Sequence, residues 1–178
     1  MKKIILFIWE IVKISIIALI IVVPIRAFVF QPFFVSGASM EPNFHDYDYL
    51  IVDEISYRLG DPHQGDVVIF YNPKDLSKRL IKRVVALPGE TIKITEGQVL
   101  IKSDEDEEFS ILDESEYLSP DLKTAGHLET TLGDNQYFCL GDNRNVSLDS
   151  RSFGPVDRDL IIGRSVFRLW PLTVFAGK

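Results

Sequence analysis

The sequence has a single cysteine, three histidines and no second long apolar run after its N-terminal segment. One cysteine excludes an intramolecular disulfide, so the folded part must be stabilised by packing. Cys139 lies in the apolar run 137–140, which is typical of a buried strand residue rather than a reactive thiol. His45, His63 and His127 are scattered among polar residues, and no paired histidine or cysteine spacing indicates a metal. We therefore expect three exposed histidines, no metal and no cofactor.

Positive charge is scarce beyond the first 26 residues. Residues 1–26 carry a net charge of +3 although the whole chain carries −7, so the remainder carries −10. An acidic domain repels a phosphate backbone, which argues against nucleic-acid binding. The 178 residues have room for one anchor and one domain of roughly 145 residues, enough for a hydrophobic core.

The N-terminal segment is almost entirely aliphatic or aromatic from residue 4 to residue 23, interrupted only by Glu10 and Lys13. About 20 helical residues cross the hydrocarbon core of a bilayer. Glu10 and Lys13 are three residues apart and can pair on one helix face. Otherwise Lys13 can snorkel, or the span can shift toward residues 11–30. We predict that residues 1–30 form a single transmembrane anchor.

Two alternatives to an anchor stay open, a cleaved signal peptide and a buried helix of a soluble protein. The small residues 36–38 resemble a cleavage site, although Arg26 and several phenylalanines separate them from the apolar run. Lys2 and Lys3 precede the span, and no lysine or arginine occurs between Arg26 and Arg58. The positive-inside rule therefore predicts a cytoplasmic N-terminus and an extracytoplasmic domain.

The rest of the chain, residues 31–178, shows strand patterns rather than helical periodicity. Short β-branched and aromatic runs are separated by Gly, Pro, Asn and Asp turns, which predicts a mostly β domain. The predicted strands are 49–52, 66–71, 80–87, 91–94, 99–101, 137–140 and 160–167. Residues 103–116 contain eight acidic side chains and are expected to form a solvated insertion. A calcium site there is an alternative, but the ligand spacing of an EF-hand loop is absent.

Two residues outside the acidic stretch are candidates for a catalytic role. Ser39 lies between Gly37 and Pro42, so the backbone can turn and leave the hydroxyl exposed. Alone this signal is weak, because most serines near glycine and proline are turn residues. Lys82 shares one face of the predicted strand 80–87 with apolar side chains. If Lys82 points inward, desolvation lowers its pKa and lets it act as a general base. The alternative is an edge strand on which Lys82 and Arg83 both reach solvent.

The polar segment 141–151 follows the predicted strand 137–140 and is dense in side chains that form local hydrogen bonds. Such a loop can orient a catalytic group. It can also be a tight turn held by an ion pair between Asp142 and Arg151. The residues alone favour the second interpretation.

Four segments in order resemble the conserved boxes of bacterial type I signal peptidases. The first contains Ser39, Met40 and Pro42, and the others are residues 65–70, 82–90 and 141–154. With the anchor, the resemblance covers nearly all of the chain except the acidic stretch. It implies a signal-peptidase-like, β-rich fold with a Ser-Lys dyad, in which Ser39 is the nucleophile and Lys82 the general base.

The resemblance also implies supporting roles. Ser147 matches a hydroxyl that orients the lysine, and structural support falls to Asp142, Asp149 and Arg151. The backbone N–H of Ser39 is the implied oxyanion donor. Some relatives place a serine two residues before the nucleophile to complete the oxyanion hole. This chain has Gly37 at that position and Ser36 one step earlier, so the second donor stays open between them.

The implied function is that of a membrane-bound serine endopeptidase, which removes signal peptides from secreted precursors after small-x-small, Ala-x-Ala-like sites. Its partners are then secretory preproteins and the lipid bilayer, at a bacterial cell membrane. Aromatic side chains flanking the domain are expected either at the membrane interface or in the core: Phe28, Phe30, Phe33, Phe34, Trp170 and Phe175. Two rival functions are a self-cleaving protein with a Ser-Lys pair and an inactive, membrane-tethered binding domain. The sequence gives no oligomeric state.

Overall fold

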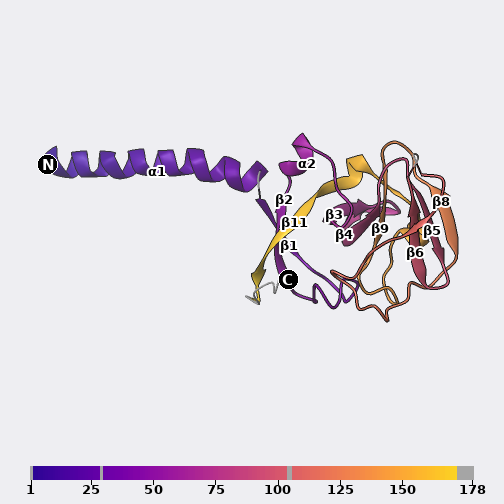
Figure 1. Cartoon of the computed structure of the whole chain (residues 1–178). Helices are drawn as coiled ribbons and strands as arrows, with labels where there is room; N and C mark the ends of the chain where they lie inside the picture. The colour runs from indigo at the N-terminus through magenta and orange to yellow at the C-terminus, as the bar shows by residue number, and fades with distance from the viewer. Residues whose placement is uncertain (1, 29, 104–105, 172–178) are drawn as a thin grey trace.

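The computed structural model describes residues 2–28, 30–103 and 106–171, with the side chains of 23–30 outside that description. Helix α1 (Lys2–Phe28) projects away from a β-rich domain, as Figure 1 shows. Its stretch from Lys2 to Val22 is long and apolar enough to cross a membrane, and none of it is buried against the domain. The predicted pair forms, since Lys13 Nζ donates to Glu10 at 2.9 Å.

The larger sheet has seven antiparallel strands in the order β1-β2-β11-β3-β4-β9-β10. Strand β4 is therefore an interior strand, flanked by β3 and β9. The bounds are β1 (Phe30–Phe34), β2 (Tyr49–Asp53), β3 (Val67–Asn72), β4 (Asp75–Ala86), β9 (Gln136–Leu140), β10 (Val156–Asp157) and β11 (Ile161–Trp170).

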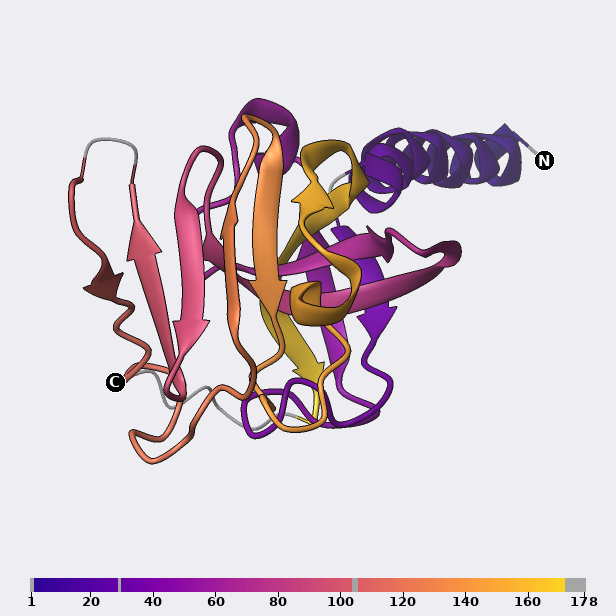
Figure 2. The ribbon, with the colours of Figure 1, turned by 90° about the vertical axis from the view of Figure 1, so that its right-hand side faces the viewer.

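The smaller sheet lies at the end of the domain away from α1, as Figures 1 and 2 both show. Its order is β7-β6-β5-β8, with bounds β5 (Thr91–Thr95), β6 (Gln98–Lys102), β7 (Ser110–Ile111) and β8 (Leu128–Thr131). One buried cluster joins the two sheets, because Val85 of β4 and Phe138 of β9 pack with Ile92 of β5 and Val99 of β6. Three short helices complete the fold: α2 (Ser56–Leu59), α3 (Ser150–Phe153) and η1 (Arg158–Leu160).

The mostly β prediction is confirmed, and each of the seven predicted strands overlaps an observed one. Cys139 is fully buried in β9, and burial raises the pKa of its thiol, as expected for an inert core cysteine. All three histidines are exposed. Strand β1 was not among the predicted strands, and it contains Pro32. An edge strand tolerates Pro32 because one side of its backbone needs no ladder partner.

The expectation of a solvated insertion at residues 103–116 is wrong at Glu114, although its neighbours Asp113 and Glu116 are exposed. Residues 110–111 form β7 of the smaller sheet. The Glu114 side chain is only 16% exposed and binds a buried arginine. An acidic run predicts a solvated segment only when its carboxylates form no buried ion pair, and here Glu114 pairs with a buried arginine.

Candidate active site

The nucleophile candidate lies on the loop between β1 and β2. Met40 is fully buried and packs with Val35 and Phe44, which anchors the loop directly beside Ser39. Gly37 has φ +87°, a left-handed conformation that favours glycine, and its N–H donates to Asp46 Oδ1 at 2.8 Å. These contacts hold Ser39 half-buried at the surface of the domain.

Lys82 lies on the interior strand β4 and is 2% exposed, so the edge-strand alternative is wrong. Its Nζ lies 2.7 Å from Ser39 Oγ and 2.7 Å from the backbone oxygen of Ile81. Burial lowers the pKa of Lys82 to about 8, although Asp149 and other nearby groups oppose that shift. A substantial fraction of Lys82 is therefore neutral near physiological pH and able to take a proton.

The loop that follows β9 presses against the backbone of Ser39. The N–H of Asn143 donates to the backbone oxygen of Ser39 at 3.1 Å. A Cβ at Gly141 would lie 2.4 Å from that same oxygen and 2.1 Å from Ser147 Oγ, so only glycine permits this approach. The Ser147 hydroxyl is buried beside the Asp149 carboxylate but outside hydrogen-bond geometry. Lys82 Nζ makes its hydrogen bonds to Ser39 and Ile81 rather than to Ser147.

The buried Asp149 pairs with the half-buried Arg151 at the start of α3. Two Arg151 nitrogens donate to the two Asp149 oxygens, each at 2.8 Å, and the Gly141 N–H donates to Asp149 Oδ2 at 3.1 Å. Burial alone would raise the pKa of Asp149, but these hydrogen bonds outweigh it and hold the pKa below its usual value. Asp149 is therefore a carboxylate that fixes both α3 and the start of the 141–147 loop.

Asp142 pairs with Arg83, and the predicted turn held by Asp142 and Arg151 is wrong. Arg83 Nε and Nη2 donate to the two Asp142 oxygens at 2.9 and 2.7 Å, and Asn43 Nδ2 donates to Oδ2 at 2.8 Å. The sheet explains the difference. Residue 83 faces Leu140 across the β4–β9 pair, which brings Asp142 next to Arg83.

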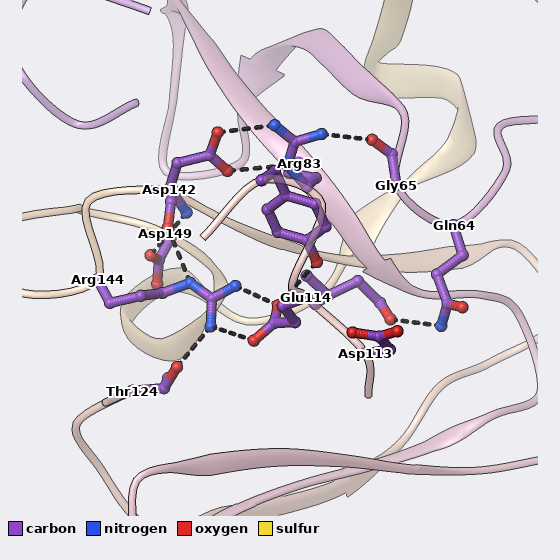
Figure 3. A network of polar contacts seen from close by, with 12 residues as sticks. Gln64, Gly65, Arg83, Asp113, Glu114, Thr124, Asp142, Arg144 and Asp149 are labelled. Carbon is purple, nitrogen blue, oxygen red and sulfur yellow. Dashed lines mark hydrogen bonds and ion pairs between the residues drawn. The ribbon is translucent and has the colours of Figure 1, made fainter. Parts of the chain in front are cut away.

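A second buried arginine was not singled out from the sequence. Arg144 is 1% exposed, and Figure 3 shows its guanidinium between Glu114 and Thr124. Arg144 Nε also donates to the backbone oxygen of Gly141 at 3.0 Å. No local pattern marks this arrangement, because Glu114 lies 30 residues away in a stretch that looks solvated.

An open cleft of about 220 Å³ adjoins the Ser39–Lys82 pair. It is lined by Phe33, Phe34, Ser36, Ser39, Arg79, Leu80, Ile81 and Lys82. A larger cavity of about 360 Å³ lies beside α2 and contains neither Ser39 nor Lys82, so size alone would misplace the site. A serine hydroxyl that is hydrogen-bonded to a buried amine at the edge of an open cleft can act as a nucleophile with that amine as its base.

Comparisons with known proteins identify a family to which the chain is similar. The model of the family described as "Signal peptidase, peptidase S26" matches residues 8–170. The chain is 37% identical over 169 residues to "Probable signal peptidase I-2" of a Synechocystis species, covering 92% of this chain and 73% of that one. It is 31% identical over 169 residues to "Signal peptidase IB" of Staphylococcus aureus, covering 89% and 87% respectively.

A crystal structure of a signal peptidase I from Enterococcus faecalis is also similar, with 27% identity and a TM-score of 0.48. That similarity covers 59% of this chain and 97% of the other. On the family match and the relatives, the chain belongs to the signal peptidase family, peptidase S26, and is a serine endopeptidase of the signal peptidase I type.

Proposed function

We propose that this protein removes signal peptides with a Ser-Lys dyad, in which Ser39 is the nucleophile and Lys82 the general base. The observation that carries the proposal is the 2.7 Å contact between Ser39 Oγ and a lysine nitrogen that is 2% exposed. Neutral Lys82 accepts the Ser39 proton as Oγ attacks the peptide carbonyl carbon. The protonated amine then gives that proton to the leaving nitrogen. Water attacks the acyl-enzyme in the same way and releases Ser39.

The tetrahedral intermediate needs donors for its oxyanion. The Ser39 N–H is the first, since no described residue accepts a hydrogen bond from it. For the second, the hydroxyl of Ser36 is the better candidate, because Ser36 is exposed and lines the cleft. The Gly37 N–H is already bonded to Asp46.

The supporting residues act on the loop and on the lysine. Ser147 is proposed to orient Lys82 once a substrate fills the cleft, because its hydroxyl is buried beside the site and has no hydrogen-bond partner among the described residues. Asp149 and Arg151 hold the start of α3. Asp142 holds Arg83, the neighbour of the lysine on β4.

The cleft supports a preference for small side chains. Its walls include the apolar side chains of Phe33 and Ile81, and its volume is only about 220 Å³. Large side chains at the −1 and −3 positions are rejected by steric overlap. Precursors with alanine at those positions are therefore the proposed substrates.

The membrane is the second proposed partner, with α1 as a single-pass anchor in a bacterial cell membrane, its N-terminus cytoplasmic and the domain outside. Phe34 and Trp170 are 65% and 66% exposed, and both face Tyr49 on the intervening strand β2. They are suited to the bilayer interface, whereas Phe33 is buried in the core. The expectations for Phe28, Phe30 and Phe175 lie outside the described side chains.

The decisive experiment is cleavage of a secretory precursor with alanine at −3 and −1 by the full-length protein in detergent. Ser39→Ala and Lys82→Met should each abolish cleavage. Lys78→Met is the matched control, because Lys78 is on the same strand with a side chain 70% exposed. Cleavage at that junction by wild type and by the control alone supports the dyad. A folded wild type that cleaves no such precursor would instead favour a tethered binding domain.

A further inference from the structure

The excursion between β6 and β8 contacts the loop that follows β9. It runs through residues 103–127 and, in its described part, contains only β7. Most of its acids are exposed, including Glu116. Glu114 differs, because its side chain is 16% exposed and contacts an arginine side chain that is fully buried.

Glu114 neutralises Arg144 by a two-pronged contact. Arg144 Nη1 donates to Glu114 Oε2 at 3.0 Å, and Nη2 donates to Oε1 (Figure 3). The Tyr117 hydroxyl donates to the same Oε1 at 2.8 Å, and Thr124 accepts a further bond from Arg144. A buried guanidinium without its carboxylate is strongly unfavourable, so the position of Arg144 depends on the excursion.

Arg144 connects Glu114 to the loop that contacts Ser39. Its Nε donates to the backbone oxygen of Gly141, the residue whose missing Cβ allows close contact with Ser39. Its neighbour Asn143 donates to the Ser39 backbone oxygen at 3.1 Å. Glu114 and Ser39 are thus linked through one arginine and one tight loop.

Tyr117 gives the excursion a second point of contact with the site. The guanidinium of Arg83 lies 4.0 Å from the centre of the Tyr117 ring, a cation–π contact. The backbone oxygen of Tyr117 accepts a hydrogen bond from Asn43 at 2.7 Å, and Asn43 also holds Asp142. The excursion therefore contacts Arg83 directly and is connected to Asp142 through Asn43.

Three arginines lie at the loop with side chains no more than 15% exposed, and each pairs with one carboxylate. Arg83 pairs with Asp142 and Arg151 with Asp149, both within the segments that resemble family boxes. Arg144 takes its carboxylate from the acidic excursion. We propose that Glu114 is a positioning residue for peptide cleavage, which holds the 141–147 loop against Ser39 through Arg144. This inference rests on the proposed Ser-Lys function.

The charge of Glu114 gives the proposal a second consequence. Burial lowers the pKa of Lys82, and the nearby Asp149, Cys139 and Asp142 oppose that shift. Without the Glu114 carboxylate, Arg144 is an uncompensated cation on the same loop, which disfavours the ammonium form of Lys82. The midpoint of the pH–rate profile then moves to lower pH, while the plateau rate falls because the loop is misplaced.

The test uses full-length protein in detergent and compares Glu114→Gln, Glu114→Asp and Glu116→Gln. Glu116→Gln removes the same charge from an exposed neighbour and should match wild type. Glu114→Gln should lower the plateau kcat by about 10-fold, with KM changed less than about twofold. Its pH midpoint should move to lower pH. Glu114→Asp keeps the charge and should restore the midpoint, with a plateau between the two.

A spectroscopic readout separates this proposal from the proposed function. The titration of Lys82, followed by NMR of ¹³C-labelled lysine and assigned with Lys82→Met, should also move to lower pH in Glu114→Gln. If the Lys82 titration shifts in Glu114→Gln but the wild-type protein cleaves no precursor, the proposed dyad function is wrong, whereas the coupling between Glu114 and Lys82 is supported. The positioning role would be overturned if Glu114→Gln left both the pH midpoint and the Lys82 titration unchanged and lowered the rate only in proportion to the amount of folded protein that is lost.

A milder variant covers the case in which Glu114→Gln does not fold. Thr124→Val removes one hydrogen bond to Arg144 at nearly constant volume. It should lower the plateau kcat about threefold without moving the pH midpoint, because no charge changes. A plateau equal to that of wild type would mean that the contacts of Arg144 do not affect the rate.

Discussion

At the scale of single residues, the reaction depends on how much of Lys82 is neutral. Because burial lowers the pKa of Lys82 to about 8, the active fraction of enzyme grows as pH rises through that value. We expect kcat/KM for a small-x-small precursor to rise about tenfold per pH unit below the midpoint and to level off above it. A steady-state pH profile measures this. A midpoint near the pKa of an ordinary histidine would indicate another base.

The same burial has a cost in folding free energy. Lysine titrates near 10.5 when unfolded and near 8 in this fold, so between these values the unfolded chain binds more protons and stability rises with pH. Below pH 8 the cost reaches about 3 kcal/mol. Lys82→Met should therefore stabilise the fold by about 1–3 kcal/mol at neutral pH, and by less above pH 10.5. Urea unfolding at both pH values measures this, and equal gains at both would contradict it.

Removing one charge of the Arg83–Asp142 pair should lower the free energy of unfolding. Asp142 is fully buried and Arg83 is 9% exposed. Asp142→Asn leaves the guanidinium buried without its carboxylate, and we expect a loss of about 3 kcal/mol in the free energy of unfolding. Asp61→Asn is a suitable control, since Asp61 also pairs with an arginine but its side chain is 79% exposed. Similar losses in both variants would mean that burial of the pair does not matter.

At the scale of elements, the contact between two loops places the nucleophile. Gly141→Ala would place a methyl group 2.4 Å from the Ser39 backbone oxygen, so one loop must move. We expect kcat to fall about 100-fold, because a displacement of about 1 Å has that effect on a positioned nucleophile. Gly60→Ala is the control, since its Cβ would meet only Ser56 O at 3.6 Å. Full activity of Gly141→Ala would show that the loops do not position Ser39.

The strands were predictable where local patterns were strong. The run around Lys82 and the run 137–140, which contains Cys139, are dense in apolar strand-forming residues, and both became core strands. Strand β1 was missed because its Pro32 is tolerated only at a sheet edge, and an edge position is not visible in a single segment. The solvation of Glu114 in the acidic excursion was also misjudged, because its partner Arg144 lies on another loop and is not visible in the acidic segment itself.

At the scale of the whole molecule, helix and domain are separable. Strand β1 begins at Phe30, so residues 1–28 can be deleted without removing a strand of the sheet. We expect the truncated protein to fold and to stay soluble without detergent. If Phe34 and Trp170 contact lipid, it should still sediment with vesicles, and Phe34→Ser with Trp170→Ser should abolish that binding. Vesicle flotation of the truncated protein with and without the two substitutions measures this. Equal flotation of both would show that Phe34 and Trp170 do not contribute to lipid binding.

Much of this protein was readable from the chain alone. The apolar N-terminal run, the β-rich pattern and the segments around Ser39 and Lys82 are local features, and local features depend only on residue type and spacing. They were enough for the class of fold, whereas Ser39 and Lys82 were weak candidates by themselves and were singled out only by the resemblance of four ordered segments to the signal peptidase boxes.

Only the tertiary structure determined the state and the partners of those residues. The sequence permitted Lys82 to face solvent, and its burial follows from the interior position of β4 between β3 and β9. The partner of Asp142 and the contact between Glu114 and Arg144 join segments 59 and 30 residues apart. Desolvation and ion pairing depend on which distant segments meet, and that is decided by packing rather than by any local pattern.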